Sequence, residues 1–173
     1  LLAYPLTCIY FLFFGLSLLV FHPIQWFCFN VFGYQAHKKS VDYLNLCLTR
    51  CLHFLGCSYQ FKVPKDLPKN VPVIIVANHQ SMNDIPPIIW FMRKFHVKFI
   101  SKKELGKGLP SVSYNLRHGG SVLIDRKDAK QALSKIKEMA TYIEKNNRSV
   151  VIFPEGTRSR DGQPKPFQTR GLA

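Results

Sequence analysis

Residues 71–87 read VPVIIVANHQSMNDIPP, and this stretch decides the fold. Its first seven residues, 71–77, form a short apolar run rich in β-branched side chains, which is typical of a strand buried on both faces. Polar residues follow at once, and Pro86 and Pro87 push the residues before them away from helical dihedrals. The stretch therefore predicts a buried strand that leads directly into a turn. Loops beyond the carboxyl ends of strands are where α/β folds usually hold ligands.

The turn carries a histidine and an aspartate five residues apart, His79 and Asp84. On a straight helix the two would lie about 140° apart around the axis and would not touch. In a turn, Asp84 can fold back onto His79. A carboxylate bonded to one imidazole nitrogen fixes the tautomer and leaves the other nitrogen as a base. A catalytic base is thus one reading of His79, and an ordinary structural histidine at a strand end is the other.

The chain beyond the turn alternates between strand and helix patterns. Three more short apolar runs predict strands, at 97–100, 121–124 and 150–153. Apolar residues recur every three to four positions over 128–146, which predicts an amphipathic helix with Asp128 as its N-cap. A shorter helix is expected over 88–95. The alternation predicts an α/β domain over 61–173, with a β-sheet flanked by helices.

Two of these strands also end in polar residues. Residues 119–126 read GGSVLIDR, so the strand delivers Arg126 to its end, where it is either part of a site or a solvated side chain. Residues 153–160 read FPEGTRSR and follow the last strand. In this segment Gly156 allows close backbone approach, and Arg158 and Arg160 can bind phosphate in a bidentate fashion.

The alternatives for the last segment differ from residue to residue. Glu155 can pair with an arginine or with a hydroxyl of an acceptor, or it can belong to an ordinary surface ion pair. Arg160 and Asp161 are better read as surface residues. If the strands are neighbours in one sheet, their ends form one site that combines a base with cations.

Residues 1–36 contain no Lys, Arg, Asp or Glu. Residues 4–21 are almost entirely apolar, and His22-Pro23 separates them from a second apolar run at 24–32. A membrane span needs about 17–25 apolar residues. We expect this leader to be a membrane-associated helical element that either spans once or lies as a helical hairpin in one leaflet. A cleaved signal peptide or a packed hydrophobic helix of a soluble protein are the alternatives.

The charges lie beyond the leader, from Lys38 to Arg170, and the formal net charge is +14. A helix is expected over 37–60, because apolar residues recur at helical spacing up to Gly56. A basic surface beside an apolar leader favours anionic lipid as the partner. Aromatic residues gather in the leader and not among the basic residues, which disfavours stacking on nucleic-acid bases. The sequence therefore predicts a membrane surface as partner and no nucleic acid.

The five cysteines lie between Cys8 and Cys57 and form no C-x-x-C pair, so no metal site is expected. They are read as buried thiols in a reducing compartment. No G-x-S-x-G motif is present, and no cysteine lies at a predicted strand end. A covalent acyl-enzyme on serine or cysteine is therefore poorly supported.

At these motifs the chain resembles the glycerolipid acyltransferases, the family of 1-acylglycerol-3-phosphate acyltransferase. Its N-H-x-x-x-x-D motif matches residues 78–84, its second motif resembles 120–126, and its F-P-E-G-T-R-S motif matches 153–159. The resemblance covers about residues 60–171. The family's fourth motif is absent, so we expect the chain to be a piece of a longer protein, with the α/β domain incomplete at its C-terminus. Where the family often has F-K-x-G, residues 167–171 read FQTRG, which puts the role of Arg170 in doubt.

The resemblance implies an acyl transfer to the sn-2 hydroxyl of 1-acyl-sn-glycerol 3-phosphate, which gives phosphatidic acid. It implies His79 as the general base and Asp84 as its orienting partner. The residues implied to hold the phosphate and glycerol of the acceptor are Arg126, Glu155, Gly156, Thr157 and Arg158. It implies no metal or prosthetic group, with acyl-CoA or acyl-acyl carrier protein as the donor.

Other functions remain open on the sequence. The acceptor can instead be glycerol 3-phosphate, another lysophospholipid or an amino-acid-derived lipid such as lyso-ornithine lipid. A non-enzymatic protein that binds anionic membranes is the remaining alternative. The expected location is the cytoplasmic face of the inner (cell) membrane.

Overall fold

A computed structural model of the chain describes residues 2–62, 64, 67, 71–159 and 163–167. Its centre is a four-stranded sheet in the order β1-β4-β2-β3, in which every neighbouring pair is parallel. The strands are β1 (Ile74–Val76), β2 (Val97–Lys102), β3 (Val122–Ile124) and β4 (Ser149–Ile152). Each overlaps a predicted apolar run, but β1 is an edge strand in which Ile74 and Val76 are exposed, so the expected burial on both faces is wrong for β1. Because the strands are parallel, their carboxyl ends meet at one edge of the sheet.

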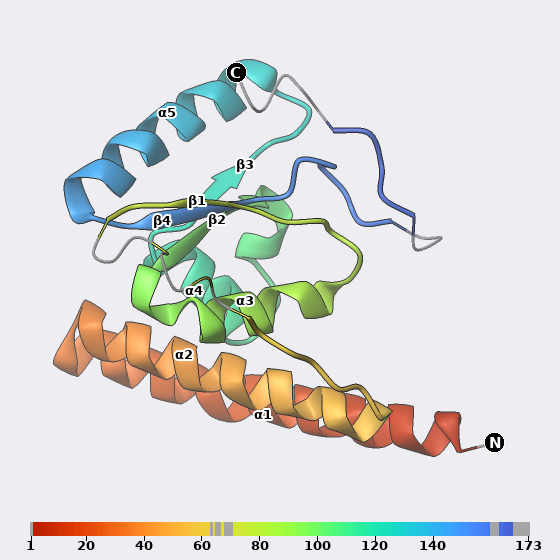
Figure 1. Cartoon of the computed structure of the whole chain (residues 1–173). Coiled ribbons are helices and arrows are strands. Elements are labelled where there is room, and N and C mark those ends of the chain that lie inside the picture. Colours follow the sequence, from red (N-terminus) through yellow and green to blue (C-terminus); the bar gives the residue numbers. More distant parts are fainter. Residues whose placement is uncertain (1, 63, 65–66, 68–70, 160–162, 168–173) are drawn as a thin grey trace.

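Helices cover both faces of the sheet (Figure 1). The helix α5 (Ala129–Asn146) lies on one face, while α3 (Ile85–Phe91) and α4 (Val112–His118) lie on the other. The predicted N-cap of α5 is confirmed, because Asp128 Oδ1 accepts a hydrogen bond of 3.0 Å from the backbone N–H of Gln131. Short 3-10 turns precede or follow several elements, at Met82–Asp84 (η2), Arg93–Phe95 (η3) and Lys103–Gly106 (η4).

The helix expected over 88–95 begins earlier than predicted. The helix α3 starts at Ile85, which has helical dihedrals of φ −69° and ψ −51°. Our expectation that the two prolines exclude helix at this point is therefore wrong. Pro86 and Pro87 occupy the first helical turn, where backbone N–H groups have no partner within the helix in any case. The side of α3 that faces β2 and β4 joins the hydrophobic core, whose buried members are Met92, Val97, Phe99 and Val151.

The N-terminal part forms a hairpin of two long helices, α1 (Ala3–Phe32) and α2 (Tyr34–Cys51). The predicted interruption at His22-Pro23 does not occur. The helix α1 is 30 residues long and continues through Pro23 to Phe32. The leader is therefore one helix, and the second arm of the hairpin is the amphipathic α2. Gly33, with φ +78°, makes the sharp turn between the two helices.

A contact from α4 supports α1 where the proline weakens it. Pro23 has no N–H to donate to the carbonyl four residues before it. One residue earlier, the carbonyl of Leu18 accepts a hydrogen bond of 2.6 Å from the hydroxyl of Ser111. The backbone N–H of Ser111 donates to His22 Nδ1 at 3.0 Å. Two contacts that are distant in sequence thus reach α1 close to its proline.

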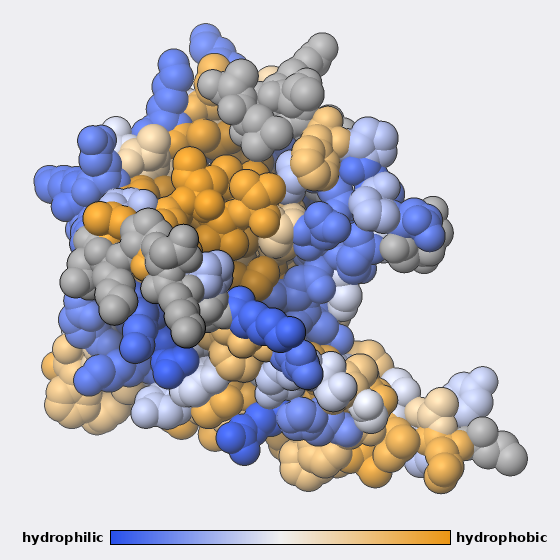
Figure 2. Space-filling model, in the orientation of Figure 1, coloured by the Kyte–Doolittle hydropathy of each residue, from blue (hydrophilic) through white to orange (hydrophobic). Residues whose placement is uncertain are grey.

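The helix α1 is long and apolar enough to cross a membrane, judged by length and composition. Only 6% of its most apolar 18-residue window is buried against the rest of the molecule. Apolar side chains accordingly lie exposed along the α1 edge of the molecule (Figure 2). The two arms of the hairpin lie against the α/β layer together, with α1 in contact with α4 and α2 in contact with α3 (Figure 1). This arrangement indicates that the protein associates with a membrane through α1.

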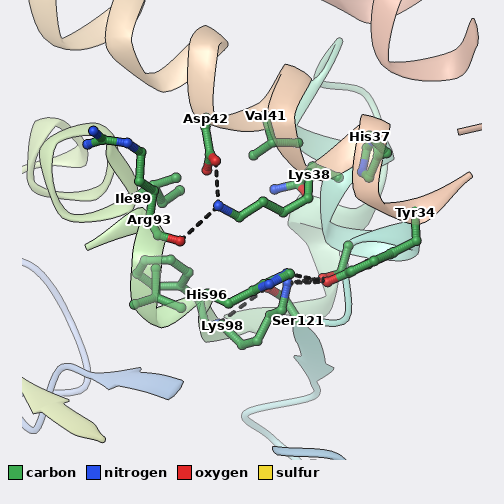
Figure 3. Close-up of a pocket in the computed structure, with 14 residues that line it drawn as sticks. Tyr34, His37, Lys38, Val41, Asp42, Ile89, Arg93, His96, Lys98 and Ser121 are labelled. Carbon is green, nitrogen blue, oxygen red and sulfur yellow. Dashed lines mark hydrogen bonds and ion pairs between the residues drawn. The ribbon is translucent and has the colours of Figure 1, made fainter. Parts of the chain in front are cut away.

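The layer between α2 and the sheet is polar and surrounds a small hollow (Figure 3). Lys98 of β2 is only 5% exposed, and its Nζ donates to the hydroxyl of Tyr34 at 2.7 Å and to the carbonyl of Gly119. The same hydroxyl lies 2.7 Å from His96 Nε2. The hairpin is thus held to the domain by directed hydrogen bonds as well as by apolar contact.

The charges around the hollow are mostly positive. Lys38 pairs with Asp42 and donates to the carbonyl of Arg93 at 2.8 Å. Burial, together with the charges of Arg148 and Lys38, lowers the pKa of Lys98 to about 7. A lysine at this position is therefore easily deprotonated.

Candidate active site

The first two site segments meet because β1 and β4 are neighbours in the sheet. The register pairs Val76 with Ile152, and the N–H of Ala77 donates to the carbonyl of Ile152 at 3.1 Å. The residues that follow the two strands therefore continue side by side. The imidazole of His79 stacks on the ring of Phe153, with centroids 4.2 Å apart and an interplanar angle of 21°.

The turn after β1 brings Asp84 onto His79, as predicted. Nδ1 of His79 lies 3.0 Å from Asp84 Oδ2, and that oxygen also accepts from the backbone N–H groups of Gln80 and Ser81, at 2.8 and 2.9 Å. Ser81 caps η2, since its hydroxyl accepts from the N–H of Asn83 at 2.9 Å. Ser81 and Asp84 together make a capping box, which keeps the turn in one conformation.

The charge of Asp84 is stabilised by these contacts. Burial alone would raise its pKa, but the hydrogen bonds from His79 and from the N–H groups of Ser81 and Gln80 outweigh that effect and hold the pKa below its ordinary value. An ionised Asp84 accepts a hydrogen bond from the N–H at Nδ1. This bond fixes the tautomer of the imidazole and leaves the lone pair on Nε2. Within the described part of the chain, no group bonds to that second nitrogen, and the side chain of His79 is 18% exposed. The site can therefore supply a base that is open to an incoming hydroxyl.

Glu155 holds the two segments together from behind. Its side chain is 2% exposed, Oε1 accepts from the N–H of His79 at 2.9 Å, and Oε2 accepts from the N–H of Lys165 at 3.0 Å. The hydrogen bonds from Lys165 and His79 lower the pKa of Glu155, so it remains ionised. This buried, fully engaged position differs from the predicted contact with an acceptor. A short-range pattern cannot reveal it, because both partners lie at least ten residues away.

The third segment contributes Arg126, which lies two residues after the end of β3. Its Nη1 donates to the carbonyl of Gly156 at 2.5 Å. Gly156 has φ +67°, a conformation that L side chains rarely adopt, so a glycine is required where its carbonyl turns toward Arg126. Although β2 lies between β3 and β4 in the sheet, so that these two strands are not neighbours, this hydrogen bond brings the segments that follow them together.

The rest of the FPEGTRSR segment lies along the same edge. Thr157 and Arg158 are exposed, and the carbonyl of Arg158 accepts from Lys165 Nζ at 3.1 Å. The N–H of Ser159 donates to the carbonyl of His79 at 2.9 Å. Arg158 therefore directly precedes the residue whose backbone bonds to His79. Arg160, Asp161 and Arg170 lie outside the described residues.

In the described ranges, no group of three or more His, Cys, Asp and Glu side chains is placed so that it could hold a metal ion. The five cysteines are free thiols on α1, α2 and the segment that follows them. The chemistry available at the strand ends is thus that of a base, a carboxylate and two guanidinium groups.

Three contributors to the site were missed by the sequence analysis. The Ser81 cap has a local signal, because serine three residues before a carboxylate is a capping-box pattern. The stacking of Phe153 on His79 has no local signal, since it depends on the pairing of β1 with β4. A third contact, between Tyr10 of α1 and Asn83 of the turn, joins residues 73 positions apart.

The chain is similar to several known proteins. The sequence profile of the Acyltransferase family matches residues 58–172. A 1-acyl-sn-glycerol-3-phosphate acyltransferase of Helicobacter pylori is 40% identical over 93 residues, which are 52% of this chain and 37% of that protein. The protein of the same name from Cocos nucifera is 37% identical over 99 residues, which are 57% of this chain and 32% of that protein.

More distant relatives cover more of the chain. The human 1-acyl-sn-glycerol-3-phosphate acyltransferase beta is 30% identical over 116 residues, which are 67% of this chain and 41% of that protein. The crystal structure of the 1-acyl-sn-glycerophosphate (LPA) acyltransferase PlsC from Thermotoga maritima matches with a TM-score of 0.77 and 26% identity, over 98% of this chain and 67% of that one. The chain thus spans between 32% and 41% of the length of these three curated relatives.

Proposed function

The chain belongs to the Acyltransferase family, and on that premise we propose that it carries the catalytic site of a 1-acyl-sn-glycerol-3-phosphate acyltransferase. The reaction moves a fatty acyl group from a thioester to the sn-2 hydroxyl of 1-acyl-sn-glycerol 3-phosphate, and the product is phosphatidic acid. One observation carries the proposal: the His79–Asp84 pair lies at the same sheet edge as Arg126 and Arg158. The names of the relatives and of the solved neighbour support the choice of acceptor.

The proposed mechanism uses His79 as the general base. Its Nε2 takes the proton from the acceptor hydroxyl, and the oxygen attacks the thioester carbonyl carbon. As the tetrahedral intermediate collapses, the new C–O bond remains and the C–S bond breaks. The thiolate leaves and receives the proton that His79 carried. Asp84 stabilises the imidazolium that exists between these two proton transfers.

The other site residues bind and position. Arg126 and Arg158 supply the positive charge that attracts the acceptor phosphate, and guanidinium groups suit that ligand because they donate in pairs. Gly156 and Thr157 directly precede Arg158 in the chain, and the carbonyl of Gly156 accepts the hydrogen bond from Arg126. Glu155 keeps the backbone of His79 in place from its buried position.

The lipid acceptor and the exposed apolar face of α1 imply a membrane partner. We place the site on the cytoplasmic face of the cell membrane, where acyl-CoA or acyl-acyl carrier protein is the donor. No metal or prosthetic group takes part in the proposed reaction. The net charge of +14 supports attraction to anionic headgroups on that face.

An acceptor panel tests the proposal. The full-length protein in vesicles is given labelled acyl-CoA or acyl-acyl carrier protein with 1-acyl-sn-glycerol 3-phosphate, glycerol 3-phosphate, other lysophospholipids or lyso-ornithine lipid. We expect labelled phosphatidic acid to form fastest. Preferred acylation of another acceptor would overturn the acceptor assignment, and acyl transfer to none of them would overturn the enzymatic proposal.

A further inference from the structure

One hydrogen bond connects the apolar helix α1 to the turn that carries the proposed catalytic pair. The hydroxyl of Tyr10 donates to Asn83 Oδ1 at 2.8 Å. Tyr10 is 3% exposed, although Phe11 and Leu12 beside it on the helix are each 58% exposed. A single turn of α1 therefore faces lipid with one side and the active-site turn with the other.

The position of Tyr10 is well defined. Its ring packs against Phe11 and Phe14, with centroids 5.0 and 5.5 Å away. A tyrosine that is buried in apolar surroundings needs a partner for its hydroxyl, because an unsatisfied buried polar group costs about 1–3 kcal/mol. Asn83 is that partner.

Asn83 lies inside the hydrogen-bond network that shapes the turn. Its own N–H donates to the hydroxyl of Ser81, and the N–H of Ser81 donates to Asp84 Oδ2. The same oxygen of Asp84 bonds to His79 Nδ1. A displacement of Asn83 thus reaches the imidazole through three successive hydrogen bonds.

We propose that Tyr10 is a positioning residue, whose hydroxyl holds Asn83 and so keeps Asp84 aligned with His79. The proposal rests on the proposed function, because it assigns the base of that reaction to His79. In this proposal α1 positions the active-site turn in addition to contacting the membrane. Turnover then depends on α1 remaining docked against the turn.

The substitution Tyr10→Phe removes only the hydroxyl. In the full-length protein in vesicles, we expect kcat to fall roughly three- to tenfold, the effect of one neutral hydrogen bond. The KM for the acceptor should stay within about twofold, because Tyr10 does not touch the phosphate-binding arginines. The matched control is Tyr4→Phe, the same change on the same helix at a side chain that is 80% exposed, and it should leave kcat unchanged.

A double variant separates positioning from general loosening of the fold. Asn83→Ala alone should lower kcat, and adding Tyr10→Phe to it should cause no further loss, because the two residues act through one contact. A kcat for Tyr10→Phe equal to that of Tyr4→Phe would overturn the proposal. So would losses that multiply in the double variant, or a loss carried by KM alone.

Hydrogen exchange tests the same contact without relying on activity. The N–H groups of Gln80 and Ser81 are protected by Asp84, so Tyr10→Phe should speed the exchange of the segment 78–84 roughly severalfold, and Tyr4→Phe should not. If the wild-type protein transfers no acyl group, the proposed function fails, and the exchange rates still decide whether Tyr10 holds the turn. Equal exchange in the two variants would refute the positioning role.

Discussion

The imidazole of His79 is restrained on every side except one. Asp84 bonds to Nδ1, Phe153 stacks on the ring, Glu155 accepts from the backbone N–H, and Ser159 donates to the backbone carbonyl. Among the residues that the structure describes, none bonds to Nε2, which is therefore open to a substrate proton. Such a fixed base has little reorganisation to undergo before it reacts, which favours catalysis.

Arg158 and the acceptor phosphate give a prediction at the scale of single residues. Arg158→Ala should raise the KM for 1-acyl-sn-glycerol 3-phosphate about tenfold, the lower end expected for an exposed charge-assisted contact, with a smaller change in kcat. Steady-state kinetics on vesicles measure both constants. The control Lys130→Ala removes one positive charge from exposed α5 and should leave KM unchanged. An Arg158→Ala variant with the wild-type KM would show that this side chain does not bind the phosphate.

At the scale of elements, the polar layer between α2 and β2 sets how firmly the hairpin is attached. Lys98 is surrounded by Tyr34, His96, Lys38 and Arg148, so its charge is poorly compensated. Its pKa is about 7 in the folded protein, against an ordinary value of 10.5. Between these two pH values the unfolded chain keeps a proton that the folded chain has lost. Folding stability from this group therefore rises with pH over that window.

This titration can be measured directly. The free energy of unfolding of the wild type should increase between about pH 7 and pH 10 relative to that of Lys98→Met, by at most about 1.4 kcal/mol per pH unit. Denaturant unfolding at several pH values gives the difference. Lys130→Met, a matched change at an exposed lysine of α5, should follow the wild type. A Lys98→Met curve parallel to the wild-type curve would show that Lys98 is protonated throughout.

The elements show which parts of the fold can be read from sequence. The run that became β4 was recognisable because strands buried on both faces are largely apolar, while β2 was recognisable from apolar residues on either side of Lys98. The start of α3 was misjudged, since prolines that break a helix interior are tolerated in its first turn. The continuity of α1 at Pro23 was also missed, because His22-Pro23 was taken as an interruption of a helix that in fact continues to Phe32.

Some contacts of the candidate site could likewise be predicted from the sequence, and others could not. The His79–Asp84 contact could be predicted because turn geometry is local. The buried place of Glu155 and the contact of Tyr10 with Asn83 could not, since they join segments 76 and 73 residues apart. Such contacts are decided by how the sheet and the hairpin pack.

At the scale of the whole molecule, the helical hairpin forms one layer and the α/β part the other. Both arms of the hairpin contact the α/β part, α1 through α4 and α2 through α3, and apolar side chains are exposed along α1 (Figures 1 and 2). The active-site turn touches α1 through Asn83. A lipid acceptor that stays partly in the bilayer is thereby close to the base that would deprotonate it.

The central claim is that His79 deprotonates the acceptor hydroxyl, and single-turnover acyl transfer tests it most directly. Full-length wild-type protein and His79→Ala, each saturated with labelled acyl donor and 1-acyl-sn-glycerol 3-phosphate, are compared at equal folded concentration. We predict that folded His79→Ala forms phosphatidic acid roughly 10²–10⁴-fold more slowly than the folded wild type. A His79→Ala variant that forms it at close to the wild-type rate would contradict the account.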